Sequence, residues 1–217
     1  METKKLGVNG KIPGGSVKGS VYFYNDSDFK GVHGAVTVKI PSGMSVACGA
    51  EFGTYKKNNA KAVDYGSGDY YSYWRMDGLL NLKKEIPIPN TPLALFGFGG
   101  GVYFNMTNSG KIAGMNDPSA GYNDLEAALA AQEAKYTDAV NLSEQASPSG
   151  LTYTPQAPDG IGHFTFGLNA TAIIGLNKAK TKFYADGTLN GELTSNGGGA
   201  LDLSFDVDAY FFTGPKS

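Results

Sequence analysis

Strict alternation of apolar and polar residues is the feature that most constrains how this chain folds. From residue 201 to residue 211 every second residue is apolar, and the residues between them include Asp202, Asp206 and Asp208. Successive side chains of a β-strand point to opposite faces, whereas in a helix these apolar residues would scatter around the axis. The pattern therefore predicts an amphipathic β-strand with one apolar and one polar face.

The same alternation recurs in residues 36–40, 44–53 and 163–174. Connections rich in Gly, Pro, Asn and Ser separate such runs, and short connections join antiparallel neighbours because parallel strands need a long crossover. About ten strands are expected on this basis. Asp186-Gly187 and Asn190-Gly191 are typical of hairpin turns, since Gly accepts a positive φ. A polar face that meets solvent is the default interpretation of such strands.

Residues 124–136 break the alternation, because they are dense in Leu, Ala, Glu and other helix formers. Asn123 is a suitable N-cap for a helix here, and Asp124 and Glu126 suit the positive end of its dipole. The sequence therefore predicts one helix within a chain that is otherwise β-rich.

The fold class expected is mainly all-β, with antiparallel amphipathic strands that form a large curved sheet, a sandwich or a barrel. The stretches around the predicted helix have too few apolar side chains for a core of their own. We therefore expect a single β-rich domain over residues 1–217, with a β block at 15–111, a helix-bearing insertion at 112–160 and a second β block at 161–213.

Composition excludes several classes of function. The 217 residues include 18 Lys and Arg against 20 Asp and Glu, so no broad positive surface for nucleic acid is expected. Aromatic residues make up 12% of the chain, which argues against disorder, and no apolar run reaches the ~18 residues of a membrane helix. Cys48 is the single cysteine, so no internal disulfide is possible, and its apolar strand face predicts an inert buried thiol.

Four glycines lie in the segment Phe96-Gly-Phe-Gly-Gly-Gly-Val-Tyr-Phe104. A phosphate-binding loop would need a following helix and a Gly-Lys-Ser/Thr sequence, and this segment has neither. We interpret the run as a bend or bulge, or a place where another backbone comes close. No cofactor is expected.

Residues 65–75 are rich in aromatic side chains and are the best candidate for a ligand-binding site. Tyr and Trp offer stiff amphipathic area of the kind that sugar sites and protein interfaces use. The alternative interpretation is a strand with aromatics on both faces, one of them packed in the core. The candidate ligand-binding residues are Tyr65, Tyr70, Tyr71, Tyr73, Trp74 and Arg75.

Metal binding has one candidate set, Asp202, Asp206 and Asp208, which share one side of one strand and could hold Ca²⁺ if loop carbonyls joined them. A solvated polar face is the commoner alternative. His33 and His163 are too few for a zinc site, and we expect both on a solvated face.

Catalysis by paired carboxylates would need two acids in a cleft, one of them in an apolar setting. Nothing in the sequence marks any acid as buried, no Gly-x-Ser-x-Gly elbow appears, and no catalytic residue is expected. The candidates by residue type alone are Glu51, Asp64, Asp69, Asp77 and Glu85.

Three segments resemble a pattern of very large, uncharacterised bacterial envelope proteins: Ile86-Pro-Ile-Pro with Ala94-Leu-Phe-Gly-Phe-Gly-Gly-Gly-Val-Tyr-Phe-Asn-Met106, Gly150-Leu-Thr-Tyr-Thr-Pro155, and Val207-Asp-Ala-Tyr-Phe-Phe212. The similarity covers about residues 86–212 and implies a β-rich module with a helix-bearing insertion. It brings no known activity and no functional residue. It favours a module of a longer chain, at the cell surface or secreted.

The function expected is that of a non-enzymatic structural or interaction module of a larger bacterial surface or secreted protein, with an aromatic face as its ligand site. Its partners would be neighbouring modules of a longer chain or other surface proteins. The alternatives are a small outer-membrane β-barrel, which the alternating strands and many Tyr and Phe favour, and a lipid-holding β groove. A carboxylate-dependent hydrolase is third. The residues after Met1 lack the apolar segment of a signal peptide, which counts against the barrel.

Overall fold

The computed structural model describes most of the β-rich part of the chain. It describes residues 4–25, 29–40, 44–56, 70–109, 152–156, 158, 163–176, 183–195 and 200–211. The helix predicted at 124–136 and most of the insertion at 112–160 lie outside the described residues. The described residues contain no helix.

Eleven strands form within these ranges. They are β1 (Lys4–Ile12), β2 (Gly15–Asn25), β3 (Phe29–Lys39), β4 (Ser45–Lys56), β5 (Tyr70–Pro87), β6 (Leu93–Phe104), β7 (Met106–Ser109), β8 (Thr152–Pro155), β9 (Phe164–Leu176), β10 (Phe183–Ser195) and β11 (Ala200–Phe211).

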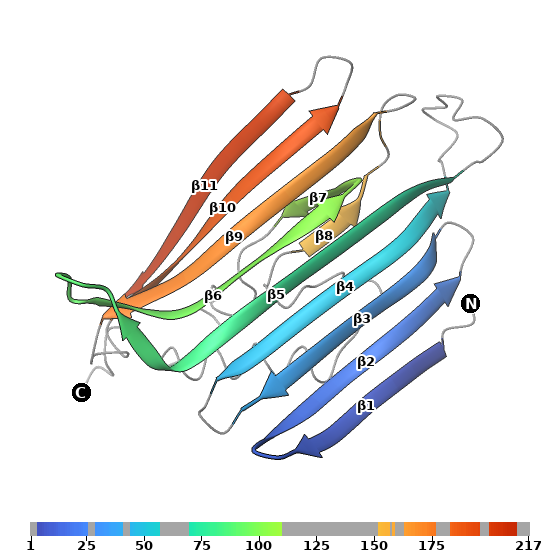
Figure 1. The fold of residues 1–217 in the computed structure, drawn as a ribbon. Coiled ribbons are helices and arrows are strands. Elements are labelled where there is room, and N and C mark those ends of the chain that lie inside the picture. The colour runs from blue at the N-terminus through green and yellow to red at the C-terminus, as the bar shows by residue number, and fades with distance from the viewer. Residues whose placement is uncertain are drawn as a thin grey trace, which may run out of the picture.

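Nine of the strands form one antiparallel sheet in the order β1-β2-β3-β4-β5-β6-β9-β10-β11, and β7 and β8 pair separately (Figure 1). Each strand therefore lies beside its neighbour in the sequence, except that the β7–β8 pair is inserted between β6 and β9. The all-β prediction and the large antiparallel sheet are confirmed. Within the described residues β1 and β11 are the two ends of an open sheet, and no closed barrel forms.

The sheet register separates two faces. Val38, Val46, Leu80, Phe98 and Ala172 are successive cross-strand partners on β3, β4, β5, β6 and β9. Because side chains alternate along each strand, every second residue shares their side of the sheet. We call this side the outer face and the opposite side, which carries the β7–β8 pair, the inner face.

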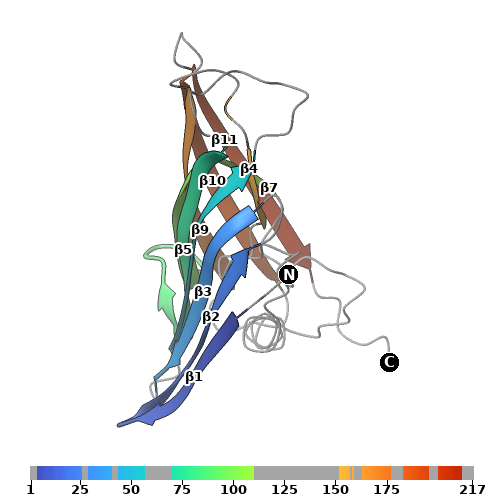
Figure 2. The same cartoon turned by 90° about the vertical axis from the view of Figure 1, so that its right-hand side faces the viewer.

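The distribution of burial reverses our expectation about these faces. The inner face is buried although it is polar: Arg75 is 0% and Glu51 is 3% exposed, whereas on the outer face Phe52 is 46% and Met76 is 45% exposed. Figure 2 shows the sheet curving, with β7 on its inner side. Tyr153 of β8 contacts Arg75, Tyr103 and Asn169 on β5, β6 and β9, so the β7–β8 pair covers this part of the polar face. The default interpretation of a solvated polar face is therefore wrong for these strands.

Two sequence interpretations of local structure are also corrected. Asp186-Gly187 and Asn190-Gly191 lie inside β10 rather than in hairpin turns, because β9 and β11 pair with β10 along almost its whole length. The first strand begins at Lys4, before the start at residue 15 that we expected, and it pairs continuously with β2.

The glycine run of β6 behaves as the sequence predicted. The pairing with β9 shifts register between Leu95 and Gly97, which is a bulge or irregularity. A side chain at Gly99 or Gly100 would collide with the carbonyl oxygens of Gly78 and Asn169 on the neighbouring strands. Both parts of the interpretation, bulge and close backbone approach, are confirmed.

Candidate functional site

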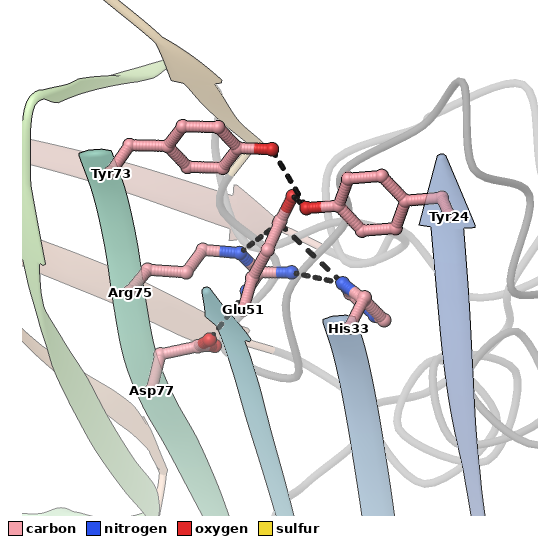
Figure 3. A network of polar contacts seen from close by, with 6 residues as sticks. All are labelled: Tyr24, His33, Glu51, Tyr73, Arg75 and Asp77. Carbon is pink, nitrogen blue, oxygen red and sulfur yellow. Dashed lines mark hydrogen bonds and ion pairs between the residues drawn. The ribbon is translucent and has the colours of Figure 1, made fainter. Parts of the chain in front are cut away.

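A network of polar side chains occupies the centre of the inner face (Figure 3). His33, Glu51 and Arg75 are consecutive cross-strand partners on β3, β4 and β5. Directly opposed residues on adjacent strands have their Cβ atoms about 5 Å apart, so the register alone brings these three side chains together. Tyr24 and Tyr73 lie next to them on β2 and β5.

Arg75 is the centre of the network and is completely buried. Its Nε donates to Glu51 Oε2 at 3.1 Å, and its Nη1 donates to Asp77 Oδ1 at 2.6 Å. Its Nη2 lies 3.2 Å from His33 Nδ1, which also lies 3.5 Å from Glu51 Oε2. A buried charge is tolerated only when it is paired and hydrogen-bonded, and these contacts meet that requirement for Arg75.

One tyrosine hydroxyl contacts Glu51, and a second tyrosine hydroxyl contacts the first. Tyr24 donates to Glu51 Oε1 at 3.1 Å, and the Tyr24 and Tyr73 hydroxyls are 2.7 Å apart. The rings have room because Gly31 and Gly53 lie beneath them: a Cβ atom at Gly53 would come within 2.5 Å of the Tyr73 hydroxyl. Tyrosine on one strand and glycine on its neighbour therefore pack as a matched pair.

β8 covers the network from the inner side. The Arg75 guanidinium carbon lies 5.1 Å from the centre of the Tyr153 ring, which is within the range of a cation–π contact. Asn169 donates from Nδ2 to the Tyr153 hydroxyl at 2.6 Å, and the Tyr103 and Tyr153 rings meet edge to face at 5.5 Å. Tyr103 donates to Glu192 Oε2 at 3.0 Å.

Asn105 fixes the point at which the chain leaves β6 for β7. It has a positive φ of 50°, a conformation that Asn tolerates better than most residues. Its side chain donates to the Ser72 carbonyl at 2.9 Å and accepts from the Thr165 amide at 3.1 Å. Its backbone amide donates to the Thr165 carbonyl at 2.7 Å. Asn105 therefore ties β5, β6 and β9 together where β7 begins.

The outer face is the second feature of the site. Large apolar side chains are exposed on it from β1 to β10. They are Leu6, Ile12, Phe23, Val36, Ile40, Phe52, Met76, Ile86, Phe98, Leu168, Leu189 and Leu193.

An open apolar hollow of about 420 Å³ lies in the middle of the outer face. Met76, Leu80 and Phe98 are among the residues that line it, together with Gly78 and Gly100. The two glycines have no side chains to fill the space, which explains the depression. The hollow has the same apolar character as the face around it.

The candidate ligand-binding residues do not form one surface. Tyr71, Tyr73 and Arg75 are buried on the inner face, whereas Trp74 lies on the outer face and stacks on Phe104 at a ring distance of 6.0 Å. Tyr65 and the side chain of Tyr70 lie outside the described part of the chain. Ligand binding by this set stays a prediction.

The candidate metal ligands Asp202, Asp206 and Asp208 lie in β11, and their side chains are outside the described residues. Among the side chains that the structure describes, no group of three or more His, Cys, Asp or Glu could hold a metal ion. Calcium binding by the three aspartates stays a prediction.

The sequence analysis did not predict that several polar residues are buried. Glu51 and Asp77 are buried, Glu85 is half-buried, and the remaining candidate acids, Asp64 and Asp69, lie outside the described residues. The solvated position expected for His33 is wrong, since only 7% of this residue is exposed. His163 is half-buried.

Cys48 was expected to be buried and is exposed on the outer face. In residues 71–77 two tyrosines and two charged residues occupy every second position and so share one face, and this mixture was the available signal for a buried polar face. If the polar face is the buried one, Cys48, which lies on the apolar side of β4, is expected to be exposed.

No helix in the described residues is long and apolar enough to cross a membrane. No protein-family model matches the chain, and no curated protein matches its sequence.

Proposed function

We propose that the protein is a non-enzymatic structural β module whose outer face lies against membrane hydrocarbon, as one wall of an outer-membrane type of β-structure. The observation that carries the proposal is the polarity of the two faces: the exposed face is apolar, and the buried face holds the charges. Water-soluble sheets have the opposite arrangement. In membrane β-strands, apolar side chains that point outward alternate with polar side chains that point inward.

The size of the outer face argues against contact with water. Contiguous apolar patches on soluble monomers seldom exceed a few hundred Å², and larger patches mark sites of protein or membrane interaction. Here the exposed apolar side chains run from Leu6 on β1 to Leu193 on β10. A face of this width needs an apolar partner along its whole length.

The outer face also has the dimensions of a bilayer core. On β2, nine residues run from Gly15 to Phe23, and a tilted strand that crosses a bilayer needs roughly 9–11 residues. Between the levels of Phe23 and Val17, every outer-face position from β2 to β9 is apolar or glycine.

The inner face supports the same proposal. Ionisable side chains at membrane depth face the protein interior and pair with one another, as Arg75, Glu51 and Asp77 do here. Hydrocarbon also requires every backbone polar group to be hydrogen-bonded within the protein. From β2 to β10 each strand of the sheet has a hydrogen-bonded neighbour on both sides.

The other expectations from the sequence have less support. A lipid-holding groove would need an apolar inner face, and here the inner face carries the polar network. A hydrolase would need a free carboxylate pair, and Arg75 engages both Glu51 and Asp77. A module of a larger bacterial surface protein is compatible with the membrane proposal, since neighbouring modules would supply partners for the sheet edges.

Two arginine substitutions test the proposal. Val36 lies midway along the outer face, and Ser72 lies exposed at the end of β5 on the same face. In lipid vesicles, Val36→Arg should lower the free energy of unfolding, measured by urea titration, by about 2–4 kcal/mol, and Ser72→Arg by about 0–1 kcal/mol. Equal small losses for both variants, or a wild-type protein that stays in solution apart from the vesicles, would contradict the proposal. The second result would indicate that another protein covers the face.

A further inference from the structure

We infer that a row of aromatic side chains across the outer face marks the boundary between membrane hydrocarbon and water, with Trp74 at that boundary. The inference rests on the proposed function and adds to it the depth and orientation of the sheet. Three observations carry it: the alignment of the row, the contacts between its rings, and the change of residue type immediately beyond it.

The row follows the register of six adjacent strands. Each member is the direct cross-strand partner of the next, so the row crosses the sheet at one level of the register. From β2 to β9 its members are Phe23, Val32, Phe52, Trp74, Phe104 and Phe166. Five of these six positions are aromatic.

The rings on β5, β6 and β9 contact one another. Trp74 stacks on Phe104 at 6.0 Å and 13°, and it meets Phe166 edge to face at 6.3 Å. Phe104 also stacks on Phe164 at 5.9 Å. Phe23 and Phe52 continue the row with nearly half of each residue exposed. The rings on β5, β6 and β9 therefore form one aromatic cluster at this end of the outer face.

The outer face changes character one position beyond the row. The next outer-face residues towards the strand ends are polar on four adjacent strands, and they are again direct cross-strand partners. They are Asn25, Lys30, Thr54 and Ser72. All of them except Thr54 are exposed.

On the other side of the row the face is apolar, with Val21, Ala50, Met76 and Val102 at the next level. On β2, β4 and β5 the outer face therefore changes from an apolar to an aromatic to a polar residue over four residue steps. Trp, whose ring is amphipathic, collects at membrane–water interfaces, and membrane β-structures carry girdles of aromatic residues at that level. The ends of β2 and β4 and the starts of β3 and β5 lie at this edge of the outer face, so the inference places these strand ends on one aqueous side.

The chain supplies its own probe for a depth measurement, because Trp74 is its only tryptophan. The wild-type protein is incorporated into vesicles of phosphatidylcholine brominated either near the headgroup or near the end of the acyl chain, and Trp fluorescence is recorded. The comparison variant is Trp74→Phe/Val36→Trp, which moves the probe to the exposed Val36 position four residue steps deeper.

The inference predicts that headgroup-proximal bromine quenches Trp74 more strongly than chain-end bromine does, and that the order reverses for Val36→Trp. Equal or stronger quenching of Trp74 by chain-end bromine would overturn the inference and leave the membrane proposal intact. If neither type of lipid quenches either protein, the sheet does not contact hydrocarbon and both proposals fail. The ratio of headgroup-proximal to chain-end quenching of Trp74 in the wild-type protein decides the inference even if the variant does not fold.

Discussion

Replacing Arg75 with methionine is the sharpest test of the buried polar network. Methionine keeps an unbranched side chain and removes the charge and every donor of the guanidinium. The substitution leaves the carboxylates of Glu51 and Asp77 in place, with side chains 3% and 0% exposed. Neither carboxylate can reach water, so each loses its cationic partner without gaining a hydration shell.

The expected loss is large because an uncompensated buried charge costs more than the pair itself contributes. Removing one partner of a buried ion pair destabilises a protein by about 3–5 kcal/mol. We therefore expect Arg75→Met to lower the free energy of unfolding by that amount, which is a factor of roughly 10²–10³ or more in the ratio of folded to unfolded protein. Urea titration of the protein in lipid vesicles, followed by tryptophan fluorescence, measures the loss.

Two control variants separate charge from packing. Lys18→Met removes an exposed lysine from β2 and should change stability by no more than about 0.5 kcal/mol. Arg75→Met/Glu51→Gln/Asp77→Asn removes all three charges and should recover much of the loss. A loss below about 1 kcal/mol for the single variant, or a triple variant no more stable than the single one, would refute the account of the network.

Two further substitutions test how the inner face packs. Gly167→Ala should destabilise the protein by about 1–3 kcal/mol, because its Cβ would overlap the Tyr103 ring, whereas Gly10→Ala meets nothing within 4 Å and should be close to neutral in the same thermal or urea denaturation. Asn105→Ala should cost at least about 2 kcal/mol, since it removes two hydrogen bonds at a position with positive φ; stability within 0.5 kcal/mol of the wild type in urea titration would show that Asn105 does not hold the β6–β7 junction.

The sequence predicted the strands well because their signal is local. Alternation with a period of two appears within each segment, and short polar connections imply antiparallel neighbours. Which face would be buried is not a local property. The same alternation fits an apolar core or an apolar exterior, and the outcome depends on what packs against each face, as β8 packs against Arg75 and Asn169 on the inner face.

The polar network depends on contacts between residues that are distant in the sequence. Arg75 meets Glu51, which is 24 residues away, and His33, which is 42 residues away. These residues come into contact only when the register of β3, β4 and β5 is fixed. The composition of the chain contains no information about that register. The sequence did allow the prediction that Trp74 and Arg75 lie on opposite faces of the sheet, because adjacent residues of a strand point to opposite sides.

The prediction of hairpin turns in residues 186–191 failed for a related reason. Asn-Gly and Asp-Gly favour turns, but pairing with two neighbouring strands stabilises an extended backbone through a long row of hydrogen bonds. Tertiary pairing therefore overrode the local preference of both dipeptides.

Spin labelling at Cys48 tests the membrane position of the outer face most directly. Cys48 is the only cysteine, and it is exposed midway along this face. In lipid vesicles a nitroxide on Cys48 should be accessible to dissolved oxygen and shielded from a water-soluble nickel chelate, and the order should reverse for a nitroxide on Cys48→Ser/Ser72→Cys. A Cys48 label that the nickel chelate reaches as readily as the Ser72 position would show that water, rather than lipid, meets the apolar face.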